Sequence, residues 1–233
     1  MQPVIETHNL YKIYNPGENE VRALDGVNLR IEKGEFVAIV GHSGSGKSTL
    51  MNMIGCLDVP TAGQYLLNGT DVGMLNDDQL SEIRNEQIGF VFQSFNLIQN
   101  LTAYENVELP LIYRGLPAAK RRHMAEEALA RMGLADRMRH RPNEMSGGQQ
   151  QRVAVARAIA GQPPLILADE PTGNLDTKAG AAVFDLITQL HQEGNTIVLI
   201  THDNGLAKKA ERMVRITDGQ VDDRPLPENS EVL

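Results

Sequence analysis

The chain has 233 residues, of which 41% are hydrophobic and 22% charged. These values are ordinary for globular proteins and exclude wholesale disorder, and the length allows one large domain or two small ones. The 30 acidic residues outnumber the 22 Lys and Arg residues, which gives a net charge of −8 at pH 7. Dedicated nucleic-acid-binding proteins usually carry a broad basic face, so we expect no nucleic-acid partner.

The cysteine content and the apolar runs set two further limits. Cys56 is the one cysteine of the sequence, which excludes an intrachain disulfide and a cysteine-based metal cluster. Its apolar neighbours favour a small buried side chain. The N-terminal residues lack the features of a signal peptide, and no apolar run approaches the roughly 20 residues that span a bilayer. We therefore expect a cytoplasmic chain, so that any membrane crossing would belong to another chain.

The N-terminal third combines two kinds of predicted strand. Val27, Leu29 and Ile31 alternate with polar residues, which is typical of an antiparallel strand with one exposed face. The continuous apolar run Phe36–Val40 instead predicts a strand that is buried on both faces of a parallel sheet. An Asn-Gly pair at 68–69 predicts a hairpin turn. A small antiparallel sheet should therefore flank a parallel core.

The rest of the chain alternates between helical and strand patterns. Residues 94–160 are predicted to be mainly helical, with one apolar stripe that ends at Gly133. Leu165–Ala168 and Thr196–Ile200 have the pattern of buried parallel strands. The segment between them predicts a helix that stops at Gly194. Its apolar face consists of Val183, Leu186, Ile187 and Leu190.

Charge is distributed unevenly along the second half. Residues 114–141 are rich in arginine, and the tail from residue 217 is acidic. Solvated helices and a frayed tail explain both features. The alternative is that the basic helices face a membrane surface or an acidic partner.

A glycine-rich segment after the first buried strand matches the phosphate-loop pattern G-x-x-x-x-G-K-[ST] in full. Glycines allow the backbone N–H groups to converge on phosphate oxygens, and the following helix adds positive charge at its N-terminus. In this pattern Lys47 reaches the β- and γ-phosphates, and the Ser48 hydroxyl ligates Mg²⁺. We expect the helix to carry apolar residues as far as Leu57. The predicted nucleotide-binding residues are Gly41, His42, Ser43, Gly44, Ser45, Gly46, Lys47, Ser48 and Thr49.

Three polar residues follow two other predicted parallel strands. The carboxyl ends of such strands are where ligands bind in open α/β sheets. Asp169 fits the Mg²⁺-binding role known from phosphate-loop enzymes. Glu170 could deprotonate a water for in-line attack on the γ-phosphate. His202, after the third strand, is a candidate contact to that phosphate.

The segment Met145–Arg152 resembles the LSGGQ signature of the ABC ATPases, with methionine in place of leucine. Ser146 should cap a helix, and the start of that helix forms a second anion site. One chain would then hold two phosphate sites. The simple resolution is a head-to-tail homodimer with each ATP lying between the phosphate loop of one chain and the signature of the other. The signature residues expected to contact ATP are Ser146, Gly147, Gly148 and Gln149.

The resemblance extends over nearly the whole chain and implies further roles. Tyr14 is similar to the aromatic residue that stacks on adenine, and Gln93 to the glutamine that senses Mg²⁺ and the γ-phosphate. Asp176 belongs to a segment similar to the D-loop, and His202 resembles the switch histidine. The implied ligands are ATP and Mg²⁺, and the implied catalytic residues are Glu170, His202, Gln93 and Lys47. The implied metal ligands are Ser48, Gln93 and Asp169.

The family also implies an architecture. We expect an α/β fold, a phosphate-loop ABC-type ATPase core with a mainly parallel sheet, an N-terminal antiparallel β-subdomain and an inserted helical subdomain. Residues 1–93 and 160–222 would form the core. Residues 94–159 would form the helical subdomain with the signature, and residues 223–233 a flexible acidic tail.

Four short segments most resemble the MacB and LolD group: Gly55–Asp58, Asn96–Ile98, Glu105–Pro110 and Gly148–Arg152. That resemblance implies an ATP-hydrolysing subunit that drives a separate transmembrane permease subunit from the inner face of the cell membrane, in an export or envelope-extrusion system. The alternative is a regulatory ABC ATPase that acts on a membrane partner without moving solute, in cell division or peptide sensing. A DNA-repair or translation ATPase usually needs a coiled-coil insertion or two tandem cassettes, and neither is present in the sequence.

An uncharged stretch after Gln93 leaves two interpretations open. Its larger apolar residues could simply pack the helical subdomain, or several could line a groove for a helix of the membrane partner. They are Phe95, Leu97, Ile98, Leu101 and Tyr104.

Overall fold

The computed structural model describes residues 3–17 and 19–223. The predicted acidic tail therefore lies, apart from its first residue, outside the described residues. The chain forms two compact units, one of Met1–Ser81 with Asn195–Leu233 and the other of Glu82–Gly194. We call them unit 1 and unit 2. The predicted boundaries at residues 93 and 160 stay a prediction.

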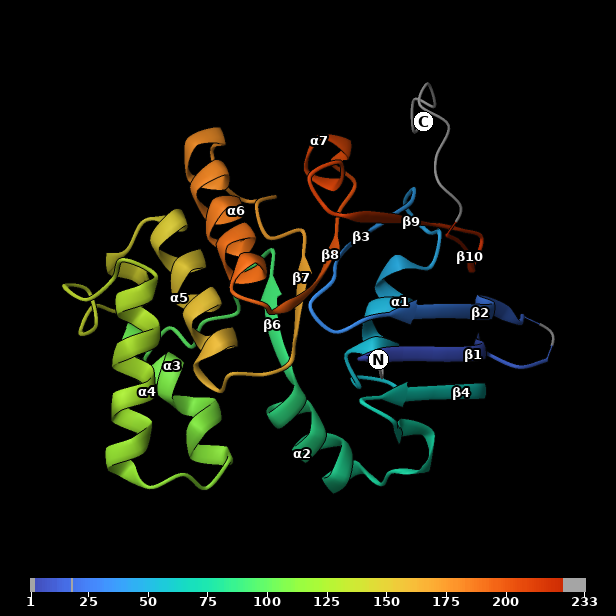
Figure 1. Ribbon diagram of the computed structural model, residues 1–233, viewed down its shortest axis with the longest axis horizontal. Helices are drawn as coiled ribbons and strands as arrows, with labels where there is room; N and C mark the ends of the chain where they lie inside the picture. Colours follow the sequence, from blue (N-terminus) through green and yellow to red (C-terminus); the bar gives the residue numbers. More distant parts are fainter. Residues whose placement is uncertain (1–2, 18, 224–233) are drawn as a thin grey trace. The chain divides into compact units, whose positions relative to one another are not determined.

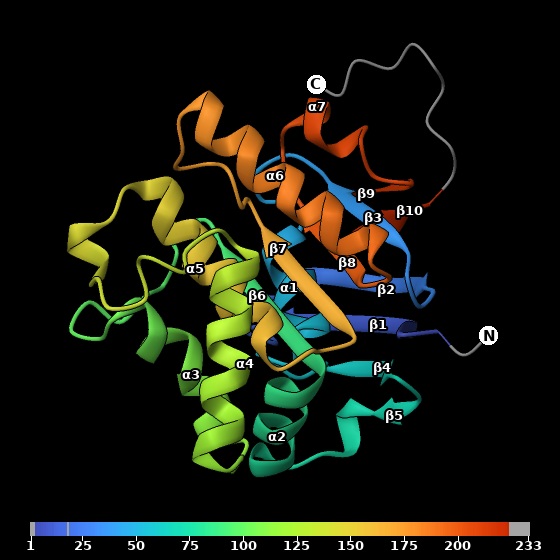
Figure 2. The same ribbon diagram turned by 60° about the vertical axis from the view of Figure 1, so that its left-hand side comes forward.

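Unit 1 contains the predicted antiparallel sheet, whose strands run in the order β2-β1-β4-β5 (Figures 1 and 2). Asn68 and Gly69, which join β4 to β5, have φ values of +48° and +78°. Positive φ at both central residues is the requirement of the tight hairpin turn that the Asn-Gly pair predicts. The strands are β1 Ile5–Tyr14, β2 Val21–Ile31, β4 Ala62–Leu67 and β5 Thr70–Asp71.

The alternating pattern of β2 is confirmed. Val27, Leu29 and Ile31 are buried, while the residues between them are exposed. Ile5 of β1 lies opposite both Ile31 of β2 and Leu67 of β4, so the apolar residues of the three strands share one face. This sheet therefore buries one side, as the sequence predicts.

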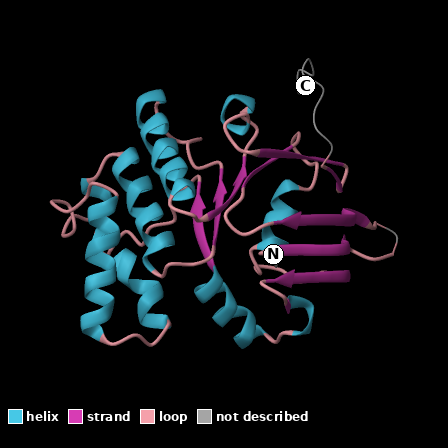
Figure 3. Ribbon diagram, in the orientation of Figure 1, coloured by secondary structure: helices cyan, strands magenta, loops and turns pink. Residues whose placement is uncertain are grey.

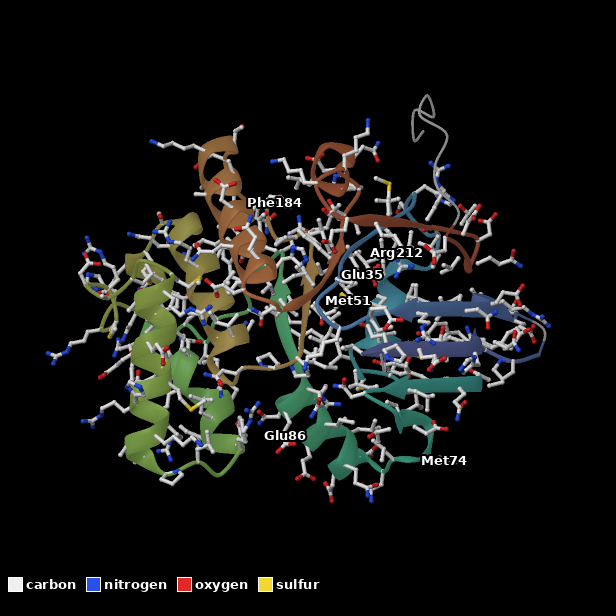
Figure 4. All side chains as sticks on the ribbon, in the orientation of Figure 1. Glu35, Met51, Met74, Glu86, Phe184 and Arg212 are labelled. Atoms are coloured by element: carbon white, nitrogen blue, oxygen red, sulfur yellow. The ribbon has the colours of Figure 1, made fainter. Side chains whose placement is uncertain are left out.

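A second set of strands in unit 1 carries the residues that matter for phosphate chemistry. β3 lies between β8 and β9 and is parallel to both, and all five of its residues are buried. Ile39 pairs with Ile200, so β3 and β8 end at the same edge. Beside this sheet Arg212 of β9 forms hydrogen bonds with Glu35 (Figure 4). The strands are β3 Phe36–Val40, β8 Thr196–Ile200, β9 Arg212–Thr217 and β10 Gln220–Asp222.

The helix after β3 is shorter than the sequence suggested. α1, Lys47–Ile54, ends at Gly55, and Cys56 has φ +52°. The chain therefore turns before Leu57, whose N–H donates to the Asn52 carbonyl and whose side chain is 47% exposed. The expectation that Leu57 lies on the buried face of the helix is wrong. Cys56 is buried, as predicted.

Unit 2 pairs two parallel strands, β6 and β7, with a helical layer (Figure 3). α3, α4 and α5 pack against one another, and α5 also contacts β6 and α6. The apolar stripe of α4 is buried, and the chain turns at Gly133 with φ +67°, as predicted. The elements are β6 Ile88–Phe92, α3 Ala103–Tyr113, α4 Ala118–Arg131, α5 Gly147–Ala160, β7 Leu165–Asp169 and α6 Thr177–Gln192.

Four further helical segments lie between these elements. α2, Asp77–Gln87, crosses the boundary of the two units, and its mostly polar sequence gave no signal for it. α7, Asn204–Ala207, follows β8, and short 3₁₀ helices occur at Val72–Met74 and Pro142–Glu144. Among the described residues, no helix is both long and apolar enough to cross a membrane.

Candidate functional site

The segment 41–48 forms a compact loop at the N-terminus of α1. Lys47 folds back over it, and its Nζ donates to the carbonyls of Gly41 and His42 at 2.7 Å each. A Cβ on Gly41 would lie 2.4 Å from the Ile216 carbonyl, and one on Gly46 would lie 2.5 Å from the Ala23 carbonyl. Both positions therefore exclude any side chain, which lets the backbone curl around a phosphate-sized ligand.

The turn between β9 and β10 supports this loop from behind. The Gly219 N–H donates to the Ser45 carbonyl at 2.9 Å, and the Gly219 carbonyl accepts from Asp25 N–H at 2.9 Å. The Ser45 hydroxyl is buried and has no partner among the described residues. Buried polar groups usually have a hydrogen-bond partner, so this hydroxyl is an exception within the loop. His42 lies at the rim, 3.9 Å from Asp218.

Tyr14 lies at the end of β1 beside this loop, and its side chain is 38% exposed, as a base-stacking platform must be. Burial and the hydrogen bond to Asp58 raise its pKa, while a side-chain hydrogen bond with Thr49 of α1 lowers it. Tyr14 is thus a direct neighbour of the phosphate-loop helix. Tyr11, the other nearby tyrosine, instead packs its hydroxyl against Gly26.

His202 is exposed and follows β8 at the same edge as the phosphate loop. The Thr201 N–H donates to the Ile39 carbonyl of β3, which ties the two strand ends together. The Thr201 hydroxyl accepts from the N–H of Asp203, which caps α7. Unit 1 therefore gathers Tyr14, the phosphate loop and His202, three of the predicted contacts to one nucleotide.

Unit 2 gathers a second group at the carboxyl edge of β6 and β7. Phe92 pairs with Asp169, so Gln93 and Glu170 leave their strands side by side. Glu170 has φ +43°, a left-handed conformation that is costly for a residue with a side chain. Such strain clusters at functional sites.

Gln151 is a residue of this group that the sequence analysis missed. Its side chain is fully buried, and its Nε2 donates to the carbonyls of Phe92 and Pro171 at 3.2 and 2.7 Å. It therefore fixes the residues that flank Gln93 and Glu170. The available signal was its position on the apolar face of α5, with Ala154, Val155 and Ala158 at helical spacing.

The signature segment starts α5 as predicted. The Ser146 hydroxyl accepts from Gln149 N–H, and the Gln149 side chain accepts from Ser146 N–H, which forms a complete capping box. A Cβ on Gly148 would lie 3.0 Å from Cβ of Ala179 in α6. Asp176 caps α6 through its Oδ1, and its predicted contact to ATP stays a prediction.

The loop that follows Gln93 is held from two sides. Gln93 Nε2 donates to Asn174 Oδ1 at 3.2 Å, and Asn174 Nδ2 donates to the Gln93 carbonyl at 3.1 Å. Arg157 of α5 donates to the carbonyls of Phe95 and Asn96, two consecutive residues with positive φ. Burial lowers the pKa of Arg157 from its ordinary value. Nothing in the sequence pattern pointed to Asn174 or Arg157.

The apolar stretch after Gln93 divides into buried and exposed members. Leu97 is buried, and Asn106 of α3, fully buried, holds the backbone of this loop through hydrogen bonds to Ile98 and Leu101. Ile98 is 46% exposed. Leu97 therefore packs inside the helical layer. The groove for a partner helix stays a prediction, and Ile98 is exposed enough to contribute to it.

The proposed metal ligands offer a hydroxyl, an amide oxygen and a carboxylate, from Ser48, Gln93 and Asp169. Mg²⁺ prefers such oxygen donors and is typically bound by one or two carboxylates together with substrate phosphates. Among the described residues, no group of three or more His, Cys, Asp or Glu side chains could hold a metal ion. Ser48 of unit 1 and Gln93 and Asp169 of unit 2 are thus oxygen donors of the type that Mg²⁺ accepts, and their role as ligands of one ion stays a prediction.

Comparison with known proteins identifies the family. The family model described as "ABC transporter" matches residues 24–173. The chain is a member of the ABC transporter family. An uncharacterized ABC transporter ATP-binding protein of Thermotoga maritima is 52% identical over 222 residues, 95% of each chain. YvrO of Bacillus subtilis, described in the same words, is 54% identical over 218 residues, 94% of this chain and 95% of its own.

A longer relative is described as both an ATP-binding protein and a permease. The macrolide export ATP-binding/permease protein MacB of Brucella melitensis is 52% identical over 219 residues. The match covers 94% of this chain but 34% of MacB, so the chain spans about a third of that relative.

Solved structures agree with the fold. The dimeric structure of the bacterial ABC transporter cassette MJ0796 superposes with a TM-score of 0.85 at 50% identity, covering 94% of this chain and 96% of that one. A second structure of that cassette, in a post-hydrolysis state bound to ADP and Pi, has a TM-score of 0.85 at 47% identity, covering 95% of this chain and all of that chain. The predicted fold class and the ATPase activity are confirmed. The chain is the ATPase subunit of an ABC system.

Proposed function

We propose that this chain is a separate ATP-hydrolysing subunit that drives an export or envelope-extrusion system of the MacB and LolD type. Two relatives of nearly the same length are identical to it at more than half of the aligned residues, and MacB carries a similar segment in a longer chain. The observation that carries the proposal is the loop at Gly41–Ser48, which forms a backbone cradle at a helix N-terminus.

Each predicted site residue has its own role in the binding or hydrolysis of ATP. Backbone N–H groups of the loop and Lys47 bind the phosphates, and Tyr14 stacks on adenine. Glu170 accepts a proton from the attacking water, and His202 holds the γ-phosphate in place. Ser48, Gln93 and Asp169 hold Mg²⁺. When bound, the ion neutralises charge that develops on the phosphates.

The active form is a head-to-tail homodimer around two ATP molecules. Each chain has a second anion site at the capped start of α5, where the backbone N–H groups of Gly147 and Gly148 lie in the first helical turn and have no intrahelical acceptor. In this dimer the start of α5 of one chain faces the phosphate loop of the other, so that both anion sites contact the same ATP. The dimeric structures of the MJ0796 cassette support this assembly.

ATP hydrolysis by the dimer drives a transmembrane permease, which is a separate chain. The permease binds the ATPase at the inner face of the cell membrane. MacB relatives are described as ATP-binding/permease proteins, which supports a membrane partner of that kind. A partner that transmits force without moving solute remains the second candidate.

Two measurements test the proposal. Lys47→Ala should abolish binding of a fluorescent ATP analogue and hydrolysis, whereas Lys208→Ala, at an exposed site of the same unit, should change neither. Retained binding in Lys47→Ala would overturn the role of the loop. Purification from membranes in detergent should recover a permease, and transport by the reconstituted pair separates export from force transmission. Recovery of a membrane protein without transport activity would favour the second candidate.

A further inference from the structure

Three side chains form a connected cluster at the end of β1. Lys12 Nζ donates to Asp58 Oδ1 at 2.6 Å, and the Tyr14 hydroxyl donates to Asp58 Oδ2 at 3.1 Å. Lys12 and Tyr14 belong to β1, whereas Asp58 lies in the turn after α1. The carboxylate thus joins the strand to the helix that starts at the phosphate loop.

The Lys12–Asp58 pair is well fixed. The side chains are 12% and 29% exposed, so solvent screens the pair less than it screens a surface ion pair. Asp58 Oδ1 also accepts from Val59 N–H at 2.8 Å, and Lys12 Nζ also donates to the Val59 carbonyl at 3.0 Å. Burial alone would raise the pKa of Asp58, but the bonds from Lys12 and Val59 lower it. The carboxylate is therefore charged and held in one orientation.

Tyr14 takes its orientation from this pair. Its hydroxyl is held by the carboxylate, and the Lys12 ammonium lies over its ring, 5.1 Å from the centroid. A cation over an aromatic face is attracted by the ring electrons, which restricts the ring further. One face of the ring therefore lies toward Lys12, and Tyr14 as a whole is partly exposed.

We propose that Lys12 and Asp58 are positioning residues that fix the ring of Tyr14 so that a single face receives the adenine of ATP. The proposal rests on the proposed function, since it assumes that Tyr14 stacks on the base. A platform that is rigid before binding loses little conformational freedom when the base arrives, which improves affinity. A purely structural alternative is that the cluster only joins β1 to the turn after α1.

The two roles are separable because ATP has a base and inorganic tripolyphosphate has none. Binding of both ligands with Mg²⁺ is measured by calorimetry for Asp58→Ala and for Lys12→Met, which keeps an unbranched apolar side chain. We expect ATP affinity to fall about three- to tenfold in each variant, the scale of the net contribution of one ordinary hydrogen bond. Tripolyphosphate affinity should not change. The matched control is Glu32→Ala, which removes one of the partners of Arg30 on β2 and should affect neither ligand.

A double-mutant cycle tests whether Asp58 acts through the Tyr14 hydroxyl. Tyr14→Phe removes the donor and should also weaken ATP binding several-fold. Asp58→Ala should then cost markedly less in the Tyr14→Phe background than in the natural chain. Thermal melting of each variant shows that it is folded.

Three results would overturn the proposal: unchanged ATP affinity in both single variants, an equal loss for ATP and tripolyphosphate, or the same cost of Asp58→Ala in both tyrosine backgrounds.

A separate experiment tests the proposed role of residue 14 in binding the base. The chain has no tryptophan, so Tyr14→Trp creates a single reporter whose emission ATP should quench and tripolyphosphate should not. Absence of quenching by ATP would show that residue 14 does not contact the base, and the positioning proposal would then fail with it.

Discussion

Gln151 offers the sharpest test of how the catalytic loops of unit 2 are held. Gln151→Met keeps a similar volume in the core and removes both donated hydrogen bonds. The Pro171 carbonyl then loses its donor in a buried place, whereas the Phe92 carbonyl keeps its hydrogen bond from the Phe95 N–H. A buried polar group left without its partner costs about 1–3 kcal/mol, and we expect a loss on this scale. For a chain of this length that loss lowers Tm by about 2–12 °C.

The assay compares thermal unfolding and ATP hydrolysis of Gln151→Met with those of Gln150→Met. Gln150 is the adjacent residue of α5, and its amide makes one bond, to the Met145 carbonyl at 3.1 Å. We expect the control to lose about 1 kcal/mol or less. Gln151→Met should also lower kcat, because Gln93 and Glu170 adjoin the two released carbonyls. Equal melting temperatures and equal kcat for the two variants would refute the reasoning.

Three further predictions concern the proposed reaction cycle. Glu170→Gln should lower the hydrolysis rate about 10²- to 10⁴-fold and leave ATP binding intact; turnover within a few-fold of the natural chain would contradict the role of the base. With ATP, Glu170→Gln should be a dimer by light scattering, and adding Ser146→Arg should yield monomers; a persistent dimer would argue against the signature as the second phosphate site. Ile98→Asp, at a 46% exposed side chain, should leave ATP hydrolysis unchanged and reduce permease capture; full capture would place the permease contact elsewhere.

Several strands, the hairpin turn and the capped start of α5 could be predicted because their signals are local. The apolar run of β3 and the Asn-Gly turn specify their structures within a few residues. Ser146 and Gln149 form a capping box within one helical turn. The helix at Asp77–Gln87 was missed because its sequence is polar, with one buried residue, Leu80. The helix end before Leu57 was misplaced although Gly55 stands at it, because the residue with the left-handed conformation is Cys56 and not a glycine.

The residues that support the site could not be predicted, since their partners lie far away in the sequence. Asp58 is 46 residues from Lys12, and Gln93 is 81 residues from Asn174. Arg157 reaches carbonyls about 60 residues away. No periodic pattern encodes such pairs, whereas the phosphate loop carries its chemistry in one continuous segment. The sequence therefore predicts which residues meet the ligand better than it predicts what holds them in place.

Within unit 2, α5 links the signature to the loops that leave β6 and β7. Gln151 holds the carbonyls of Phe92 and Pro171, and Arg157 holds those of Phe95 and Asn96. Because both side chains project from one helix, α5 cannot shift along its axis without breaking these hydrogen bonds. A displacement of Gln93 by a nucleotide would therefore be transmitted to the capped N-terminus of α5, which is the segment proposed to contact the ATP of the other chain.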